Sequence, residues 1–313
     1  MMNTKIVYVL VSQDSDYYYE MTLLSLYSLR LFHPNETVVI VMDEDTHRRL
    51  LDKRAAILND VTPIIIAIPE EYNSTQRSRY LKTRLRQIVD GDFFYLDCDT
   101  LICSSLAAID SMESDIAMVE DFAFCKDNIE TCKKAGFHHL EGQIYYNGGV
   151  MYAKSTPPSY AFFEEWHRYW LQSLKNGVPQ DQPALWQTNM TLQNQIKRLP
   201  VVWNCQIQNR SVVKDVDHAI VLHYFAYKMT HHGKVLLRYV RRENGLGRLS
   251  TYIAKHPRTI GYLVFARLNE TSVQHVSERS FRDALPLSLK PLVRFYQFLW
   301  WAKRQGAKVR SIL

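Results

Sequence analysis

FFYLDCDTLI, residues 93–102, is the stretch of this chain that decides its fold. Four apolar residues in a row indicate a buried strand, and two carboxylates, Asp97 and Asp99, follow at its end, where an α/β sheet opens to solvent. Because successive side chains of a strand point to opposite faces, both carboxylates reach one cation only if the chain turns there. Such oxygen ligands suit Mg²⁺ or Mn²⁺. A turn whose aspartate caps the next helix explains the same tripeptide, and both interpretations stay open on these residues alone.

An aspartate pair after an apolar strand is also found in phosphatases that resemble the haloacid dehalogenases. Their pattern is Asp-x-Asp-x-Thr, usually near the N-terminus. Here Thr100 stands one place too early, Leu101 fills the threonine position, and the pair lies far from the N-terminus. The tripeptide is more similar to the Asp-x-Asp motif of glycosyltransferases with the GT-A fold.

Apolar runs and helical patterns alternate through the first half of the chain. Further on, one strand is expected on each side of a polar loop over 121–143, and two more helices follow the second of these strands. This order predicts an α/β fold with a doubly wound, mostly parallel sheet. The expected strands are 5–11, 38–42, 61–68, 114–120, 144–154 and 219–222. The expected helices are 19–33, 46–58 with Asp45 or Thr46 as its cap, 75–89, 157–174 and one that begins near Asp181.

The expected helix over 75–89 segregates its charges from its apolar residues. At helical spacing, Arg79, Lys82 and Arg86 form one stripe. Beside a metal that binds a diphosphate, one or two of these cations would neutralise phosphate charge. Without the neighbouring aspartates, a solvated basic face would be the better explanation of the stripe.

Two further motifs have a plain structural interpretation beside a functional one. The glycines of Asn147-Gly148-Gly149 interrupt a strand-like run, which indicates a bulge, a close approach of a ligand to the main chain, or a hairpin turn. Asp181 precedes a helical segment and by itself resembles an N-cap residue.

Four separated fragments occur in an order that resembles glycosyltransferase family 8, which includes bacterial lipopolysaccharide galactosyl- and glucosyltransferases and glycogenin. The resemblance covers about Lys5 to Lys234 and implies the GT-A fold. The fragments are RYLKTRLRQIVDGDFFYLDCDTLI (79–102), YYNGGVMYA (145–153), QDQPALW (180–186) and LHYFAYK (222–228).

The resemblance implies a site for a UDP-sugar held by Mn²⁺ or Mg²⁺, with Asp97, Asp99 and His223 as metal ligands. It also implies two catalytic residues. Asp181 is expected to hold sugar hydroxyls, and Gln182 is expected to sit near the anomeric carbon.

The same resemblance implies the residues that bind the donor. Lys82 and Lys228 are expected to contact the diphosphate and Asn147 the sugar. For Lys228 the spacing departs from the family, because Phe225-Ala226-Tyr227 intervenes. Asp14 and Tyr17 are candidates for contact with the nucleoside, in a first loop less acidic than the family's.

Composition and charge bound the remaining possibilities. The 313 residues have an ordinary hydrophobic content, and no run of eighteen apolar residues argues for a membrane-spanning helix. The absence of a signal-peptide pattern and of paired cysteine spacing predicts a cytoplasmic protein with reduced thiols. We expect a catalytic domain over residues 1–250 and a helical tail over 251–313.

The tail is basic and aromatic, since six Lys or Arg residues and no acidic residue follow Asp283. This composition suits an anionic membrane surface, and a helix docked on the core explains it equally well. No nucleic-acid motif accompanies the charge. The expected function is metal-dependent transfer of a hexose from a UDP-sugar to a glycan or glycolipid, with retention, in surface polysaccharide or lipopolysaccharide synthesis. The alternatives are a catalytically silent nucleotide-sugar-binding protein and a metal-dependent phosphatase.

Overall fold

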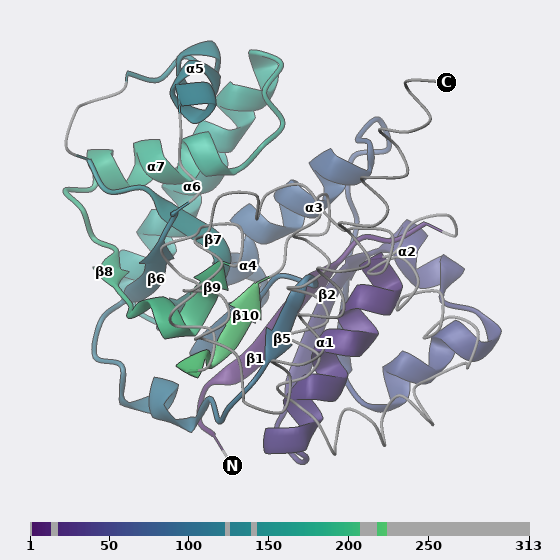
Figure 1. The fold of residues 1–313 in the computed structure, drawn as a ribbon. Helices are drawn as coiled ribbons and strands as arrows, with labels where there is room; N and C mark the ends of the chain where they lie inside the picture. Colours follow the sequence, from purple (N-terminus) through teal and green to yellow (C-terminus); the bar gives the residue numbers. More distant parts are fainter. Residues whose placement is uncertain (1, 14–17, 123–125, 139–142, 207–217, 224–313) are drawn as a thin grey trace, which may run out of the picture.

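In a computed structural model, residues 2–13, 18–122, 126–138, 143–206 and 218–223 are described, and they form a twisted sheet of seven strands (Figure 1). The strand order is β3-β2-β1-β4-β7-β6-β8. Neighbours from β3 to β4 are parallel, whereas β7 runs antiparallel to both β4 and β6. The predicted α/β fold with a mostly parallel sheet is therefore confirmed. The strands are β1 (Lys5–Leu10), β2 (Val38–Asp43), β3 (Thr62–Ile66), β4 (Phe93–Leu96), β6 (Ile116–Glu120), β7 (Tyr146–Ala153) and β8 (Lys197–Arg198).

Helices cover both faces of this sheet, because its central strands are apolar on both sides. On one face Ile6 and Tyr8 of β1 belong to the same core cluster as Leu29 of α1, and on the other Val7 belongs to the same core cluster as Trp166 of α6. The helices are α1 (Tyr18–Phe32), α2 (Glu44–Arg49), α3 (Ser74–Thr83), α4 (Leu85–Ile88), α5 (Lys126–Lys134), α6 (Pro157–Lys175) and α7 (Gln182–Thr191), with short 3₁₀ turns η1 (Asp52–Asn59), η2 (Ala107–Ser111) and η3 (Val201–Asn204).

A second, smaller sheet of three strands lies alongside α1 (Figure 1). It consists of β5 (Thr100–Ile102), β10 (Val221–His223) and β9 (Cys205–Gln206), in the order β5-β10-β9. β10 runs antiparallel to β5, and His223 pairs with Thr100. This register places a residue from late in the chain beside the turn that follows β4.

Two helices differ from the sequence prediction. The expected helix over 46–58 ends at Arg49 and gives way to η1, and its cap is Asp43, whose Oδ1 accepts from the Thr46 backbone N–H at 2.7 Å. The prediction of Asp45 or Thr46 as cap is wrong because the helix begins directly after β2. The expected helix over 75–89 breaks at Arg84, which separates α3 from α4.

The polar segment 121–143 is not all loop. Residues Lys126–Lys134 form α5, whose spacing of Ile129 and Cys132 resembles that of a short amphipathic helix. The prediction missed it because charged residues outnumber apolar ones there.

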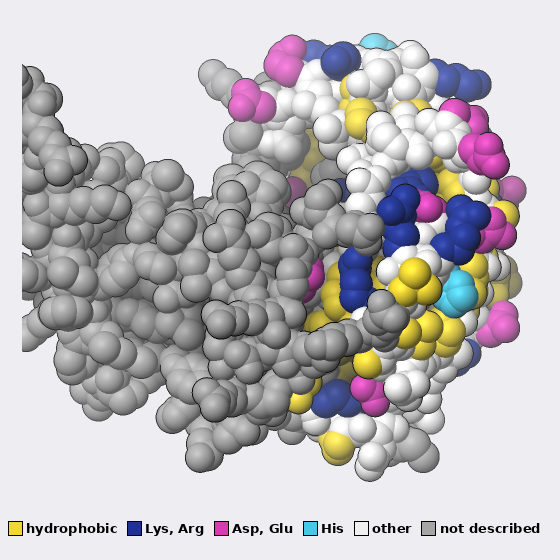
Figure 2. Space-filling view, turned by 90° about the vertical axis from the view of Figure 1, so that its right-hand side faces the viewer, with side chains coloured by type: hydrophobic (Ala, Val, Ile, Leu, Met, Phe, Trp, Pro, Cys, Tyr) yellow, Lys and Arg dark blue, Asp and Glu magenta, His cyan; other side chains and the backbone are white. Residues whose placement is uncertain are grey.

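The surface carries clustered charge. On the face shown in Figure 2, Lys and Arg side chains gather near the middle with acidic side chains beside them. In the part of the chain that the structure describes, no helix is long and apolar enough to cross a membrane. The tail and the domain boundary near residue 250 lie outside the described residues and stay predictions.

Candidate active site

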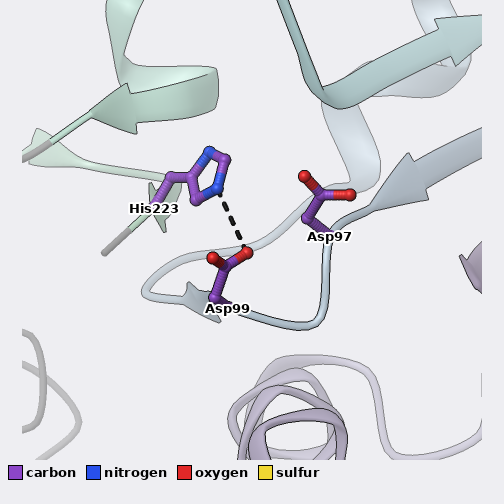
Figure 3. Close-up of side chains that lie close together, drawn as sticks. All are labelled: Asp97, Asp99 and His223. Atoms are coloured by element: carbon purple, nitrogen blue, oxygen red, sulfur yellow. Dashed lines mark hydrogen bonds and ion pairs between the residues drawn. The ribbon is translucent and has the colours of Figure 1, made fainter. Parts of the chain in front are cut away.

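The turn after β4 brings two carboxylates together with an imidazole. Asp97 and Asp99 flank Cys98, and His223 ends β10. One ligand atom from each of the three lies within 4.8 Å of the others (Figure 3). The turn is fixed at Asp97, whose carbonyl accepts from Thr100 Oγ1 at 2.7 Å and whose N–H donates to the Gly149 carbonyl at 2.7 Å. The chain therefore turns as the convergence of both aspartates requires.

The chemistry of this donor set fits a divalent cation. For an ion about 2.0–2.1 Å from octahedral ligands, adjacent ligand atoms lie about 3 Å apart. His223 Nε2 and Asp99 Oδ1 are 3.2 Å apart, which matches a pair of adjacent ligands. Two carboxylates with one imidazole suit Mn²⁺ or Mg²⁺ in ligand type.

Gly149 of β7 forms one wall of this cluster. A Cβ atom at Gly149 would lie 2.3 Å from His223 Cε1 and 2.8 Å from Asp97 Oδ2, so only glycine fits. The register between β6 and β7 shifts between Met118 and Val119, opposite the two glycines. Of the interpretations offered for Asn147-Gly148-Gly149, the bulge fits this register shift, and the hairpin turn is wrong because β7 continues through it.

Two cations from α3 reach the cluster. The Lys82 ammonium is buried and lies 3.2 Å from Asp97 Oδ1 and 3.3 Å from Asp181 Oδ2. Arg79 Nε lies 2.9 Å from Asp181 Oδ1. Burial would raise the pKa of Asp181, but the charges of Lys82 and Arg79 outweigh burial and hold this pKa below its usual value. Asp181 is therefore an ionised carboxylate, and its side chain makes no helix cap.

Arg86, the third member of the predicted stripe, does not face this cluster. Its guanidinium is fully buried, donates to the carbonyls of Val89, Gly91 and Ala153, and lies 4.8 Å from the centre of the Phe93 ring. The prediction that the stripe continues to Arg86 is wrong because the helix breaks at Arg84, so helical spacing does not carry over.

The first residue of α7, Gln182, is held by the main chain of β7. Its Nε2 donates to the Tyr146 carbonyl and to Asp121 Oδ2 at 3.4 Å, and its Oε1 accepts from the Gly148 N–H at 3.4 Å. Sequence reasoning missed Asp121 and left it in the loop. Its position directly after the buried strand β6 was the available signal, since Asp97 follows β4 in the same way.

Tyr95 also contacts the cluster from within β4. Its hydroxyl donates to Asp97 Oδ1, and the Lys82 ammonium lies 5.1 Å from the centre of its ring. Burial and the nearby negative charge of Asp97 raise the pKa of Tyr95, so the phenol keeps its proton and remains a donor. The apolar run 93–96 gave no indication of this role.

Behind His223 lie two buried amides. Asn147 Oδ1 accepts from the Gly149 N–H at 2.9 Å and from Asn204 Nδ2 at 3.0 Å, and Asn204 Oδ1 lies 3.1 Å from His223 Nδ1. Sequence reasoning missed Asn204, which belongs to no motif.

The structure thus brings together seven of the ten predicted site residues: Asp97, Asp99, His223, Lys82, Asp181, Gln182 and Asn147. Their roles toward metal and donor stay predictions. The other three, Asp14, Tyr17 and Lys228, lie outside the described residues, and the same holds for any contact they make.

Residues 33–236 match the family described as nucleotide-diphospho-sugar transferase. Among curated proteins no sequence matches the chain. The fold is similar to that of an active-site mutant of LgtC, with a TM-score of 0.50 and 13% identity over 77% of this chain and 96% of LgtC. It is also similar to the glycosyltransferase GlyE of Streptococcus pneumoniae TIGR4, with a TM-score of 0.50 and 14% identity over 83% of this chain and 64% of GlyE. For the bifunctional glycosyltransferase WbbM the TM-score is 0.52, with 14% identity over 81% of this chain and 51% of WbbM.

Proposed function

The chain belongs to the nucleotide-diphospho-sugar transferase family and is a glycosyltransferase with the GT-A fold, and from this premise we propose that it transfers a hexose from a UDP-sugar to a hydroxyl of a glycan or glycolipid. The observation that supports the proposal is one cluster in which Asp97, Asp99 and His223 converge beside the buried cation of Lys82. Carboxylates, an imidazole and an ammonium together suit a metal-bound diphosphate.

Asp97, Asp99 and His223 are the residues that would hold Mn²⁺ or Mg²⁺. When bound, such a cation neutralises charge on the departing diphosphate. Lys82 adds a charge-assisted hydrogen bond to a phosphate oxygen, because its ammonium already lies 3.2 Å from one of the metal carboxylates. Asp181 is ionised and accepts hydrogen bonds from sugar hydroxyls.

Gln182 supports a retaining reaction without a covalent intermediate. Its amide is neutral, and the main chain at Tyr146 and Gly148 orients it. Because a neutral amide is a poor nucleophile, we propose front-face attack by the acceptor hydroxyl. A phosphate oxygen of the leaving group then takes the hydroxyl proton, the new glycosidic bond forms on the face that the diphosphate leaves, and the configuration is retained.

A role in surface polysaccharide or lipopolysaccharide synthesis is the corresponding proposal at the level of the cell. It is supported by the resemblance of four fragments to family 8 enzymes and by the basic, aromatic sequence after Asp283. Peripheral attachment to an anionic membrane would bring the enzyme to a lipid-linked acceptor.

A screen of UDP-, GDP- and CDP-sugars with and without Mn²⁺ tests the proposal. We expect a thermal shift with a UDP-sugar that depends on Mn²⁺, together with slow Mn²⁺-dependent release of UDP. Binding without any UDP release, with or without acceptors, would indicate a silent nucleotide-sugar-binding protein. No shift with any of these donors would contradict the proposal.

Asp99→Asn provides the matched variant. Asn keeps the size of the side chain but removes the charge that a cation needs, so Mn²⁺-dependent activity is expected to disappear. The midpoint of thermal unfolding without metal should change little, because Asp99 lies at a turn. An active Asp99→Asn enzyme would rule out this aspartate as a metal ligand.

A further inference from the structure

Three buried polar side chains connect the candidate metal cluster to the candidate sugar-binding asparagine. They come from three elements: Asn147 from β7, Asn204 from the end of η3, and His223 from β10. Asn147 is 7% exposed, Asn204 0% and His223 2%. Buried amides of this kind are stable only when their hydrogen bonds are satisfied, so the orientation of each one is constrained by the next.

The backbone N–H of Gly149 fixes the direction of the hydrogen bonds that link these three side chains. This N–H can only donate, so the Asn147 atom that it contacts at 2.9 Å is the amide oxygen. The Asn204 atom 3.0 Å from that oxygen must then be its NH₂ group. The other Asn204 atom is consequently the oxygen, which accepts from His223 Nδ1 at 3.1 Å.

The hydrogen bond between Asn204 and His223 determines the tautomer of His223. With Nδ1 as the donor, the neutral imidazole presents a lone pair at Nε2, and Nε2 lies 3.2 Å from Asp99 Oδ1. A lone pair that faces a carboxylate oxygen is favourable when a cation lies between them. A second residue that holds a histidine in this tautomer is a common feature of metal sites.

The hydrogen bonds that Asn147 accepts determine how its side chain faces the substrate. Asn147 Oδ1 already accepts two hydrogen bonds, from Gly149 and Asn204. For Asn147 Nδ2, none of the hydrogen bonds found among the described residues provides a partner. Asn147 therefore offers a donor group, which suits a hydroxyl or phosphate oxygen of the ligand.

We propose that Asn204 is a positioning residue that sets both the metal-binding tautomer of His223 and the donor orientation of Asn147. Its carboxamide hydrogen-bonds to both side chains, and a side chain with only an acceptor or with neither function cannot replace it. The inference rests on the proposed function, because it concerns the metal and donor sugar of that same site.

Two substitutions separate the effect of Asn204 on His223 from its effect on Asn147. Asn204→Asp keeps an oxygen for His223 Nδ1 but replaces the donor to Asn147 with a second oxygen. Asn204→Leu has a similar volume and keeps neither function. Calorimetric titration with Mn²⁺ alone measures the effect on His223, and the KM for the UDP-sugar at saturating Mn²⁺ measures the effect on Asn147.

We expect Asn204→Leu to bind Mn²⁺ about 10- to 100-fold more weakly than the wild type. Asn204→Asp should bind Mn²⁺ within about threefold of the wild type, yet its KM for the donor should rise about tenfold, the usual effect of one lost hydrogen bond. A purely structural role would instead weaken both properties together in both variants.

Asn189→Leu is the matched control. Asn189 is as buried as Asn204, and its side chain bonds only to the Ile196 N–H and to Asn194, away from the site. This variant should lose stability and keep its Mn²⁺ affinity. If Asn204→Leu does not fold, the contrast between Asn204→Asp and the wild type still tests the effects of Asn204 on His223 and on Asn147.

The outcomes distinguish this inference from the proposed function. Wild-type protein that binds neither Mn²⁺ nor a UDP-sugar would overturn both. Wild-type protein that binds both, together with Asn204→Leu that binds Mn²⁺ equally tightly, would overturn only the positioning role. Asn204→Asp that loses Mn²⁺ as completely as Asn204→Leu would also overturn it.

Discussion

At the scale of single residues, Gly149 leaves no room for a side chain, because the main chain of β7 lies directly against His223 and Asp97. In Gly149→Ala the new methyl group would overlap His223 and press on Asp97. We therefore expect Mn²⁺ affinity to fall at least tenfold and transferase activity with it. Calorimetric titration with Mn²⁺ and an assay of UDP release measure the two effects.

Gly148→Ala is the natural control for this substitution. The atoms nearest to a Cβ atom there are Leu185 Cδ2 at 3.3 Å and the flexible side chains of Gln182 and Lys82 at 3.7 Å. We expect Mn²⁺ affinity to stay within about threefold of the wild type, since no metal ligand is displaced. Equal loss of affinity in both variants would mean that glycine flexibility, and not space at Gly149, matters.

Lys82 is the residue whose charge is shared between the metal cluster and Asp181. Lys82→Met keeps most of the side-chain volume but leaves Asp97 and Asp181 without the ammonium between them. We expect kcat/KM for the UDP-sugar to fall about 10- to 100-fold, the usual effect of losing a hydrogen bond to a charged group. Lys82→Arg keeps the charge and should retain more activity than Lys82→Met. Equal activity of the two variants would contradict a role for the charge.

Sequence reasoning reached the residues that carry recognisable motifs and missed those that act through geometry. Asp97, Asp99 and His223 were predicted because a strand end and a family resemblance both pointed to them. Asn204 and Tyr95 were not, since an asparagine after a tryptophan and a tyrosine in an apolar run have many ordinary explanations. Only the folded chain places their polar atoms next to His223 and Asp97.

At the scale of elements, the position of α3 is secured from behind by α6. His167 of α6 lies with Nδ1 2.8 Å from Thr83 Oγ1, and its ring packs edge-on against Tyr80. Burial, and then the nearby charge of Arg84, lower the pKa of His167 to about 4. The imidazole is therefore neutral at pH 7 in the folded protein.

This neutral histidine makes stability sensitive to acid. Because its folded pKa of about 4 lies below the usual histidine value of 6.5, the unfolded chain binds up to one more proton between these pH values. Stability contributed by the neutral imidazole is complete above pH 6.5 and decreases as the pH falls toward 4. From pH 7 to pH 5 the loss from His167 is about 1–2 kcal/mol.

His167→Gln tests this dependence. Glutamine does not titrate, and its amide can still bond to Thr83. We expect the difference in unfolding free energy between pH 7 and pH 5, measured with urea, to be smaller in the variant by this amount. His33, whose pKa is also lowered mainly by burial, is present in both proteins and cancels. Identical pH dependence of wild type and variant would refute the assignment.

The order of elements was predicted well, whereas their ends were not. Continuous apolar runs identified the buried strands, because both faces of the sheet are covered. The cap at Asp43 sets where α2 begins, and hydrophobic periodicity reports neither this start nor the helix ends at Arg49 and Arg84. In the small sheet, β5 and β9 were missed because each is three residues or shorter, whereas the strand expected over 219–222 overlaps β10.

At the scale of the whole molecule, the charge is unevenly distributed along the chain. Residues 1–285 carry equal numbers of acidic and basic residues, because the chain's formal net charge of +6 equals the six basic residues after Asp283. We expect the full chain to bind vesicles of anionic lipid at low salt and to dissociate as salt rises. A chain truncated after Leu285 should not bind, and co-sedimentation measures both. Equal binding by the truncated chain would exclude the tail as the membrane-binding segment.

The pairing of β10 with β5 has a consequence for how the protein is made. Asp99 and His223 are 124 residues apart in the chain, yet their side chains lie 3.2 Å from each other. A ribosome that adds about 5–20 residues per second needs roughly 6–25 s to synthesise the intervening segment. Throughout that interval the nascent chain carries both aspartates but not His223, so the complete set of ligand side chains exists only after β10 has been synthesised.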